Sequence, residues 1–518
     1  LGKLDDAVTC YEKTISLLPG YAVAHYNMGN AFRELGELDD AIDSYEQALQ
    51  LETRFVEAHF KKANTLREMR KFEEAVTSYR LAIQHQPDHR AAYNNLAGTL
   101  LDQDKPTDAI SELRKALALD SEFAPSHINM ASALQECGKL DEALISVQKA
   151  LELEPNSLEA NNNIGRIFQE FGDLAQGITY YQRAISINPE DPEPHWNLSL
   201  ALLIQGDWKG GWEEFEWRLK RQDKKTLLQW RPPPVEMWTG DSLQGKKILV
   251  YGEQGVGDEV MFASCIPDLI AETPDKILLE CDPRLEPLFA RSFPDIHVCG
   301  KERELDFSWI HEQGPFDYSL PIGSLPKFFR NRVEDFPERD SFLVPGAELV
   351  ETWNQRLASL GKGLKIGISW RGGQTERVIR NSSIPLPHWV PLLSMDAFFI
   401  NLQYGDTAED VDRMHTEHDI QIHDWEDNDP LQDLDNQAAL ISALDLVITI
   451  DNSTLHMAGA VGTPTWGLLE YVPDWRWPQA FGDSPPLYRS VRLFRQKQLA
   501  EWGPVLTDVE QSLKDFIG

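Results

Sequence analysis

A polar turn near the C-terminus holds the residues best suited to bind an anion. Residues 451–454 (DNST) follow a strand predicted at 445–450 and precede the helical stretch 455–460. Small hydroxyl and amide side chains at a helix N-terminus leave backbone N–H groups free and leave room for a phosphate. The pattern therefore predicts a pyrophosphate site formed by Asp451, Asn452, Ser453 and Thr454.

A weaker signal of the same kind lies earlier in the chain. Residues 252–258 (GEQGVGD) follow a short apolar strand predicted at 247–251 and open a predicted helix. A strand, a glycine-rich turn and a helix form the start of a nucleotide-binding βα unit. The glycines do not have the dinucleotide spacing, and we find no ribose-binding acid about 20 residues further on.

Short strands separated by helical stretches place these turns in two lobes. One group of strands is predicted at 247–251, 276–280 and 317–320, and a second at 365–370, 398–403 and 446–449. This alternation is typical of parallel sheets, so we expect two α/β lobes in tandem. The arrangement favours a ligand held between them.

The first 221 residues repeat with a period of 34. Small residues recur at Ala41, Ala75 and Ala109, and large residues recur four positions after each of them. Paired helices need small residues where they cross, and each pair buries its apolar face against its neighbours. The period resembles the tetratricopeptide repeat and predicts an α-solenoid of about six and a half units. Because the chain starts inside a unit, we expect further repeats before Leu1. The tryptophan-rich last unit predicts contact with another domain.

The sixth position of successive repeats carries a side-chain amide in all units but one, which has a lysine; we call these residues the amide column. A side-chain amide can bind a peptide backbone regardless of its sequence, so the column predicts an acceptor-binding surface. The alternative is a general feature of these repeats, in which asparagine is common at this position whatever the function. The column resembles that of the eukaryotic O-GlcNAc transferases. It reads Asn27, Lys61, Asn95, Asn129, Asn163 and Asn197, of which the last four are predicted to bind the acceptor.

Composition narrows the class of protein. The chain has 518 residues, a formal charge of −34 and a pI near 4.7, which disfavours nucleic acid as a partner. No apolar run reaches 18 residues, and the first residues resemble neither a signal nor a transit peptide. Five scattered cysteines without a CxxC pair are typical of reduced thiols, which predicts a cytoplasmic protein without a zinc site.

Five motifs are spread over residues 246–495 of the second half, namely GVGDE, ISWRGG, NLQYGD, DNSTLHMAGAVGTPTWGLL and DWRW. Together they resemble glycosyltransferase family 9, the ADP-heptose:lipopolysaccharide heptosyltransferases. The similarity is greater to the bacterial branch fused to tetratricopeptide repeats. It implies a GT-B fold of two Rossmann-like lobes, an inverting reaction, a nucleotide-diphosphate sugar as co-substrate and no metal or other cofactor.

The resemblance also implies roles for single residues. Asp258 matches the aspartate taken as general base, which accepts the proton of the attacking hydroxyl. The alternative is that Asp258 only caps the next helix, with Glu253 or Glu259 as base. Arg380 is a candidate cation for the diphosphate, or else an exposed loop residue. The predicted donor-binding set is Gly255, Gly257, Trp370, Arg371, Arg380, Gln403, Tyr404, Asp451, Asn452, Ser453, Thr454, His456 and Arg476.

The sequence departs from this family in three places. Its phosphate turn reads DNST rather than the common DTG, and the basic residue expected soon after the first strand of the second lobe is less clear, and both changes argue against assuming ADP-heptose as the donor. Its first lobe is also short, which shifts acceptor recognition toward the repeats. We therefore expect sugar transfer to a hydroxyl, foremost on a protein bound by the repeats. A glycolipid or polysaccharide acceptor and a non-catalytic repeat scaffold are the alternatives, and a homo-oligomer is left open.

These features predict an α plus α/β chain of three parts. Repeats occupy residues 1–225, a linker and the first lobe 226–345, and the nucleotide-sugar lobe with a terminal helix 346–518. The proline run 231–234 (RPPP) cannot continue a helix and marks the linker.

Overall fold

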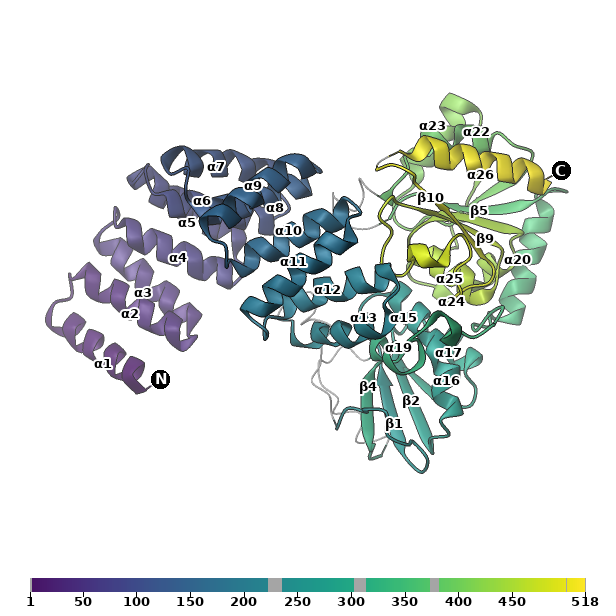
Figure 1. Ribbon diagram of the computed structural model, residues 1–518, viewed down its shortest axis with the longest axis horizontal. Helices are drawn as coiled ribbons and strands as arrows, with labels where there is room; N and C mark the ends of the chain where they lie inside the picture. The colour runs from purple at the N-terminus through teal and green to yellow at the C-terminus, as the bar shows by residue number, and fades with distance from the viewer. Residues whose placement is uncertain (1, 222–234, 302–313, 373–381, 500, 518) are drawn as a thin grey trace. The chain divides into compact units, whose positions relative to one another are not determined.

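The computed structural model describes residues 2–221, 235–301, 314–372, 382–499 and 501–517 (Figure 1). The chain divides into two compact units. The N-terminal unit comprises Leu1–Phe171 and Arg183–Pro189, and the C-terminal unit comprises Gly172–Gln182 and Glu190–Gly518. The last repeat thus belongs to the same unit as the α/β region. The predicted linker at 231–234 lies outside the described residues, and the predicted boundaries at 225 and 345 stay predictions.

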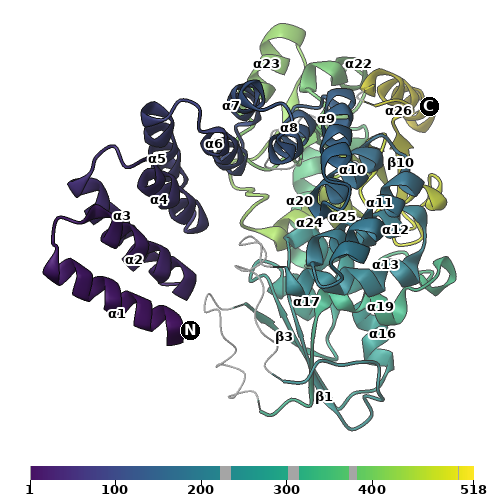
Figure 2. The same ribbon diagram turned by 60° about the vertical axis from the view of Figure 1, so that its left-hand side comes forward.

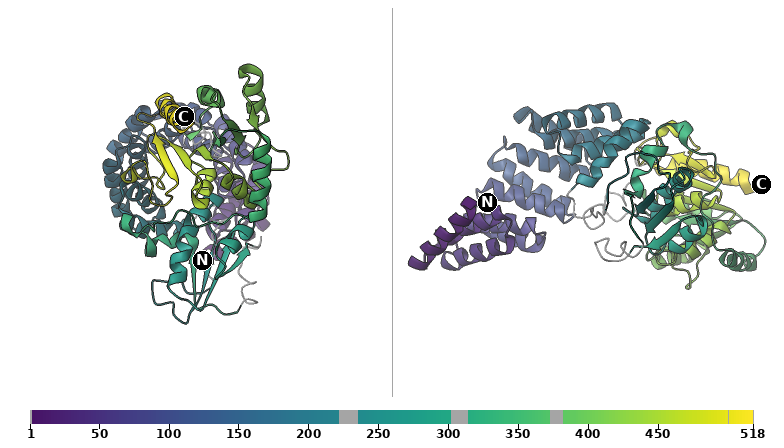
Figure 3. Two further views of the ribbon diagram at one scale, coloured as in Figure 1. Left: turned by 90° about the vertical axis from the view of Figure 1, so that its right-hand side faces the viewer. Right: turned by 90° about the horizontal axis from the view of Figure 1, so that it is seen from below.

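Antiparallel helix pairs build the N-terminal unit and confirm the predicted α-solenoid (Figures 2 and 3). Glycine in the left-handed conformation ends some of these helices, as Gly36 does after α2 with φ of 86°. The helix that follows the unit, α11 (Leu174–Ile187), is shared with the C-terminal unit. The helices are α1 (Gly2–Leu17), α2 (Ala22–Leu35), α3 (Leu38–Leu51), α4 (Val56–Glu68), α5 (Phe72–His85), α6 (Arg90–Asp102), α7 (Pro106–Leu119), α8 (Ala124–Glu136), α9 (Leu140–Leu153) and α10 (Leu158–Glu170).

The repeating small and large residues form the core of this unit. Ala41, Ala75 and Ala109 are fully buried, and so are Tyr45 and Tyr79. The two tyrosines do not only fill space, because each hydroxyl donates a hydrogen bond to an asparagine of the preceding helix. The crossing of α2 and α3 therefore depends on both the size and the polar end of the tyrosine.

The C-terminal unit begins with α12 (Pro192–Gln205), α13 (Trp208–Phe215) and the short helix η1 (Glu216–Lys220). A parallel four-stranded sheet follows, in the order β3-β2-β1-β4. Figures 1 and 2 show α13 beside α19 of this region. The strands are β1 (Lys247–Tyr251), β2 (Lys276–Cys281), β3 (His297–Gly300) and β4 (Tyr318–Pro321), with helices α15 (Val256–Phe262), α16 (Ile266–Ala271), α17 (Glu286–Ser292) and α19 (Pro326–Phe329).

The second sheet has six parallel strands in the order β10-β9-β8-β5-β6-β7. Its central strands β5 and β8 are buried along their whole length, as expected when helices cover both faces. The strands are β5 (Lys365–Ser369), β6 (Phe398–Asn401), β7 (Ile422–His423), β8 (Leu446–Ile450), β9 (Thr465–Leu469) and β10 (Val491–Arg495), and the main helices are α20 (Ala347–Ser359), α22 (Val390–Leu393), α23 (Ala408–His418), α24 (Leu434–Ser442), α25 (Ser453–Val461) and α26 (Trp502–Ile517).

The two parallel sheets with their helices confirm an α/β region in the second half of the chain. The predicted strands are present, although the run 365–370 ends as a strand at Ser369 and the run 398–403 ends at Asn401. Four strands were not predicted, namely β3, β7, β9 and β10. The edge strand β7 has two residues, and exposed Arg492 interrupts the apolar run of β10, so neither has the continuous pattern of a central strand. None of the helices in the described parts is long and apolar enough to cross a bilayer.

Gly29→Ala tests the tight crossing of α2 and α3. A Cβ at Gly29 would lie 2.7 Å from the ring of Tyr45, which is fully buried and held by its hydrogen bond to Asn30. We expect the free energy of unfolding to fall by about 1–3 kcal/mol in urea titrations. Gly20→Ala is the matched control because a Cβ there meets nothing within 4 Å. Equal stability of the two variants would contradict the packing argument.

Candidate functional site

The two predicted turns meet at the N-termini of α15 and α25. Each helix follows a strand of its own sheet, α15 after β1 and α25 after β8, and the two helices pack against each other. Gly257 lies at the closest approach: a Cβ there would be 3.5 Å from Ser453 Cα and 3.5 Å from the ring of His456. The carboxyl ends of parallel sheets are where α/β proteins bind ligands, so this junction is the candidate site.

Asp258 and Arg476 form an ion pair across this junction. Arg476 donates to Asp258 Oδ1 through Nε at 3.0 Å and also through Nη2. The side chains are 15% and 19% exposed, so the pair is largely shielded from water. Asp258 Oδ2 also accepts a bond from the Gly255 N–H at 3.3 Å, which is the helix cap considered as the alternative role. The predicted base and a predicted donor-binding cation are therefore direct partners.

Further carboxylates surround the same guanidinium. Asp474 accepts from Arg476 Nη1 at 2.6 Å, and Asp451 accepts from the indole of Trp477 at 2.7 Å. Burial, and after it the nearby charge of Asp474, raises the pKa of Asp451 to about 7. Asp451 can thus exchange a proton near neutral pH, a property that matches general acid–base chemistry.

Asn452 caps α25 and joins two strands of the second sheet. Its Oδ1 accepts from the Thr454 N–H at 3.0 Å, and its Nδ2 donates to Ser369 Oγ at 2.7 Å. Thr454 is buried, whereas Ser453 is half-buried. The amide side chain therefore uses one of the helix N–H groups that the sequence assigned to a phosphate.

Gln403 and Trp370 lie beneath the site, at the carboxyl end of β5. Gln403 Oε1 accepts from Ser369 Oγ at 3.0 Å and from the backbone N–H groups of Trp370 and Arg371 at 2.9 and 2.7 Å. Gln403 is 3% exposed and Trp370 is 1% exposed, so both support the turn from within.

The remaining donor-binding predictions lie around this support. Arg371 is more open and donates to the Asp406 carbonyl at 2.6 Å. Tyr404 is half-buried next to Gln403, and Gly255 is exposed at the cap of α15. Arg380 lies outside the described residues.

His456 is packed between two aromatic rings. Its Nδ1 lies 3.0 Å from the Tyr488 hydroxyl, and its ring stacks on Trp477 with centroids 5.1 Å apart. Burial lowers the pKa of His456 to about 3, so the ring is neutral in the folded protein near pH 7. Its place in the structure is that of a supporting residue behind Ser453.

The two alternative bases are occupied elsewhere. Glu253 is buried and accepts three hydrogen bonds from Arg218 and one from the Gly323 N–H. Glu259 accepts from the Asp282 N–H at 2.7 Å, and burial raises its pKa to about 8. Glu253 is thus held in an ion pair, while Glu259 is a protonatable group facing away from Arg476 and toward β2.

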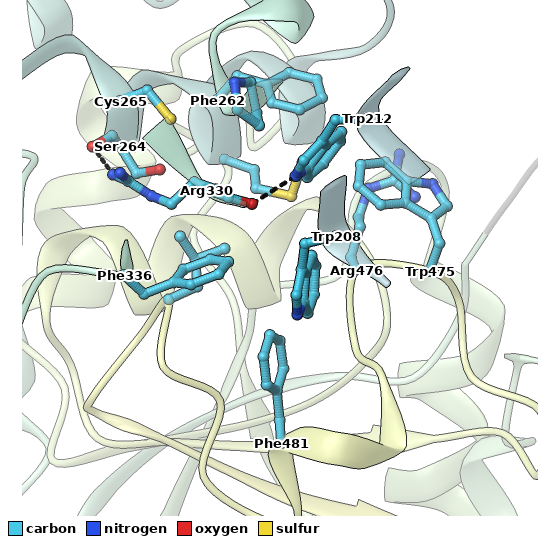
Figure 4. Close-up of a pocket in the computed structure, with 13 residues that line it drawn as sticks. Trp208, Trp212, Phe262, Ser264, Cys265, Arg330, Phe336, Trp475, Arg476 and Phe481 are labelled. Carbon is cyan, nitrogen blue, oxygen red and sulfur yellow. Dashed lines mark hydrogen bonds between the residues drawn. The ribbon is translucent and has the colours of Figure 1, made fainter. Parts of the chain in front are cut away.

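An aromatic pocket next to Arg476 was not predicted as part of the site (Figure 4). Within the described parts, Trp208 Nε1 and Arg330 Nε in its wall are buried without a hydrogen-bond partner. The signal in the sequence for this pocket was the tryptophan-rich last repeat. Its predicted contact with another part of the chain is present, since Trp212 packs against Trp475. The rings in its wall are Trp208, Trp212, Phe262, Phe336, Trp475 and Phe481.

The asparagine column bonds successive repeats to one another. Asn95 donates to Asn64 at 2.9 Å, while Asn129 donates to Asn94 at 3.0 Å. In the next repeat, a 3.0 Å bond runs from the amide of Asn163, which is 6% exposed, to the hydroxyl of Ser132 on α8. Each of these amides therefore uses one of its side-chain N–H groups for a hydrogen bond within the solenoid.

Asn197, the last residue of the column, is half-buried on α12 of the C-terminal unit. The predicted acceptor-binding residues therefore belong to both units, with Asn95, Asn129 and Asn163 in the N-terminal unit and Asn197 in the C-terminal unit.

His456→Gln is expected to change how stability depends on pH. The unfolded histidine has a pKa near 6.5 and the folded one near 3, so the free energy of unfolding falls as pH drops through this window. Between pH 7 and 5, the advantage of the wild type over the variant should shrink by about 2 kcal/mol in urea titrations followed by tryptophan fluorescence. His418→Gln, at an exposed position of the same unit, is the control. A constant difference between wild type and His456→Gln would contradict a buried neutral ring.

Comparison with known proteins identifies the repeats. Models of the tetratricopeptide repeat match residues 22–53, 60–122, 100–167 and 158–191. Among solved structures, the tetratricopeptide-repeat protein YrrB is 22% identical, covering 36% of this chain and 95% of its own, with a TM-score of 0.30. A repeat protein from Parabacteroides merdae is 16% identical, covering 43% and 89%, with a TM-score of 0.40.

A further relative matches a longer part of the chain than the repeat models do. The chain is 35% identical over 329 residues to Protein FlbA of Caulobacter vibrioides, which is 61% of this chain and 54% of FlbA. The chain thus spans about half the length of this relative. Taken together with the helix pairs, the matches show that residues 22–191 are tetratricopeptide repeats.

Proposed function

We propose that this chain is a cytoplasmic glycosyltransferase of the GT-B type, which moves a sugar from a nucleotide-diphosphate donor to a hydroxyl of a protein. The observation that supports it most is the junction of α15 and α25, where two parallel α/β lobes bring Asp258 next to a helix N-terminus. A nucleotide-diphosphate sugar needs both features, an anion site for the leaving group and a base for the acceptor.

In the proposed reaction, the acceptor hydroxyl attacks the anomeric carbon while the bond to the diphosphate oxygen breaks. Asp258 takes the hydroxyl proton, and the diphosphate leaves with the bonding electron pair. Backbone N–H groups at the start of α25 and the guanidinium of Arg476 stabilise its charge. These donors take the part that a metal ion has in other transferases.

Arg476 is then required to change partners during the reaction. In the structure its guanidinium is bound by Asp258 and Asp474. A diphosphate that attracts Arg476 releases the Asp258 carboxylate from the ion pair, which leaves it free to accept the hydroxyl proton only when donor is present. The proposal thus links proton abstraction to donor binding.

The tetratricopeptide repeats support a protein as the acceptor, because stacked helix pairs present an extended surface suited to a polypeptide. A glycolipid or polysaccharide acceptor is the alternative within the same reaction class. A non-catalytic scaffold is the second candidate function. The capped α25 and the closed Asp258–Arg476 pair favour it, since both site features are occupied within the chain.

Asp258→Ala tests the enzyme against the scaffold. With a panel of nucleotide sugars, we expect the wild type to release nucleotide from one donor and the variant to release it at least about 100-fold more slowly, because general base catalysis is lost. Release is measured by a coupled nucleotide assay. Asp474→Asn is the matched control, since it removes the other carboxylate of Arg476 and keeps the base. No release and no donor binding by the wild type would favour the scaffold.

Asn163→Ala and Ser132→Ala separate acceptor binding from repeat packing. Both variants break the same 3.0 Å bond and should lower the unfolding temperature similarly, but only the first removes the amide. If the amide binds the acceptor, only Asn163→Ala and the analogous Asn129→Ala lose transfer to a protein while keeping donor hydrolysis. Equal transfer by all three variants would assign the column to packing alone.

A further inference from the structure

The last repeat is bonded to the turn that carries Asp258. Arg218 of η1 is 3% exposed and donates to Glu253 through Nε at 3.1 and 3.2 Å and through Nη2 at 2.6 Å. The same guanidinium donates to Ser324 Oγ at 2.8 Å and to Glu216 at 2.7 Å. Glu253 lies five residues before Asp258, at the start of the turn. A fully bonded, buried guanidinium of this kind holds its partner in one position.

Gly323 adds a backbone hydrogen bond to the Glu253 carboxylate. Its N–H donates to Glu253 Oε1 at 3.0 Å, and a Cβ at this position would lie 2.4 Å from that oxygen. The approach therefore needs a residue without a side chain. The carboxylate of Glu253 is held between η1 and the loop after β4.

Aromatic rings of the last repeat hold the loop that carries Arg476. Trp212 meets the ring of Trp475 edge-on with centroids 5.6 Å apart, and Phe215 lies 5.4 Å from the same ring. The Arg476 guanidinium in turn lies 4.4 Å from the centre of the Trp475 ring. Figure 4 shows Trp212 and Trp475 on the same side of the pocket, with the Trp212 indole donating to the Arg330 carbonyl.

We propose that the last repeat positions the site: Arg218 positions Asp258 through Glu253, and Trp212 positions Arg476 through Trp475. The two members of the ion pair come from different lobes, and α13 with η1 contacts both supports. The repeat thus sets the distance between the base and the cation. This inference rests on the proposed function for its catalytic consequence, but the positioning itself is a property of the folded chain.

Hydrogen–deuterium exchange of the whole chain tests the positioning without relying on activity. In Arg218→Gln, we expect the amides of residues 253–259 to exchange about tenfold faster than in the wild type, because the turn opens more often. Gly323→Ala is the second variant, which displaces Glu253 while keeping its charge and Arg218. Arg218→Lys keeps the positive charge but lacks the planar guanidinium with its several N–H donors. It should protect the amides of residues 253–259 from exchange better than Arg218→Gln does.

Arg330→Gln is the matched control, because Arg330 is also 3% exposed and is paired with Asp268 rather than with Glu253. It should lower overall stability and leave exchange at 253–259 unchanged. Unchanged exchange in Arg218→Gln, or an equal rise in the control, would overturn the proposal.

Kinetics separate this inference from the proposed function. For an active wild type, Arg218→Gln should lower kcat about tenfold or more while the donor KM stays within about threefold, since Asp258 is displaced and the donor site is kept. If the wild type turns over no donor, the proposed function fails, and the exchange data still decide whether the repeat positions the turn. An active wild type with full kcat in Arg218→Gln would overturn the catalytic consequence.

Discussion

The ion pair between Asp258 and Arg476 is the contact around which the α/β region is organised. It joins the first turn of α15 to the loop after β9, and so connects the two sheets where their strands end. The residues are 218 positions apart, and both are largely buried. Removing one partner of such a pair leaves an uncompensated charge, which typically costs about 3–5 kcal/mol.

Three carboxylates lie around the guanidinium of Arg476. A single guanidinium faces Asp258 and Asp474, with Asp451 nearby and protonatable close to neutral pH. An additional anion at Arg476 is repelled by these carboxylates, unless one of them leaves the guanidinium or becomes protonated. In the proposed reaction, an incoming diphosphate would compete with Asp258 for Arg476, and this competition would couple donor binding to the release of the Asp258 carboxylate.

The amide column of the repeats has a packing role and is also the surface proposed to bind the acceptor. Three amides of the column, Asn95, Asn129 and Asn163, donate a hydrogen bond to the helix pair before their own. Since each amide has a second N–H, packing between repeats and binding of a polypeptide are compatible. The last repeat differs, because its tryptophans and Arg218 are bound within the C-terminal unit. It is structurally a part of the α/β region.

The sequence by itself determined the features that depend on near neighbours. The 34-residue period predicted the solenoid because every repeat packs only on adjacent repeats. The central strands β1, β5 and β8 were predictable because burial on both faces produces a continuous apolar run, and the turns after β1 and β8 were predictable from their residue types. The edge strands β7 and β10 lack that pattern.

Only the tertiary structure decided which distant groups are partners. Arg476 was predicted to bind the donor and Asp258 to act as general base, yet the fold pairs them. Glu253 was an alternative base, yet Arg218 holds it. His456 and Gln403 were predicted to reach a ligand, and the fold buries both. The physical reason is that burial and ion pairing depend on the packing of segments that are remote in the chain, and no local pattern of residue types encodes the identity of a partner.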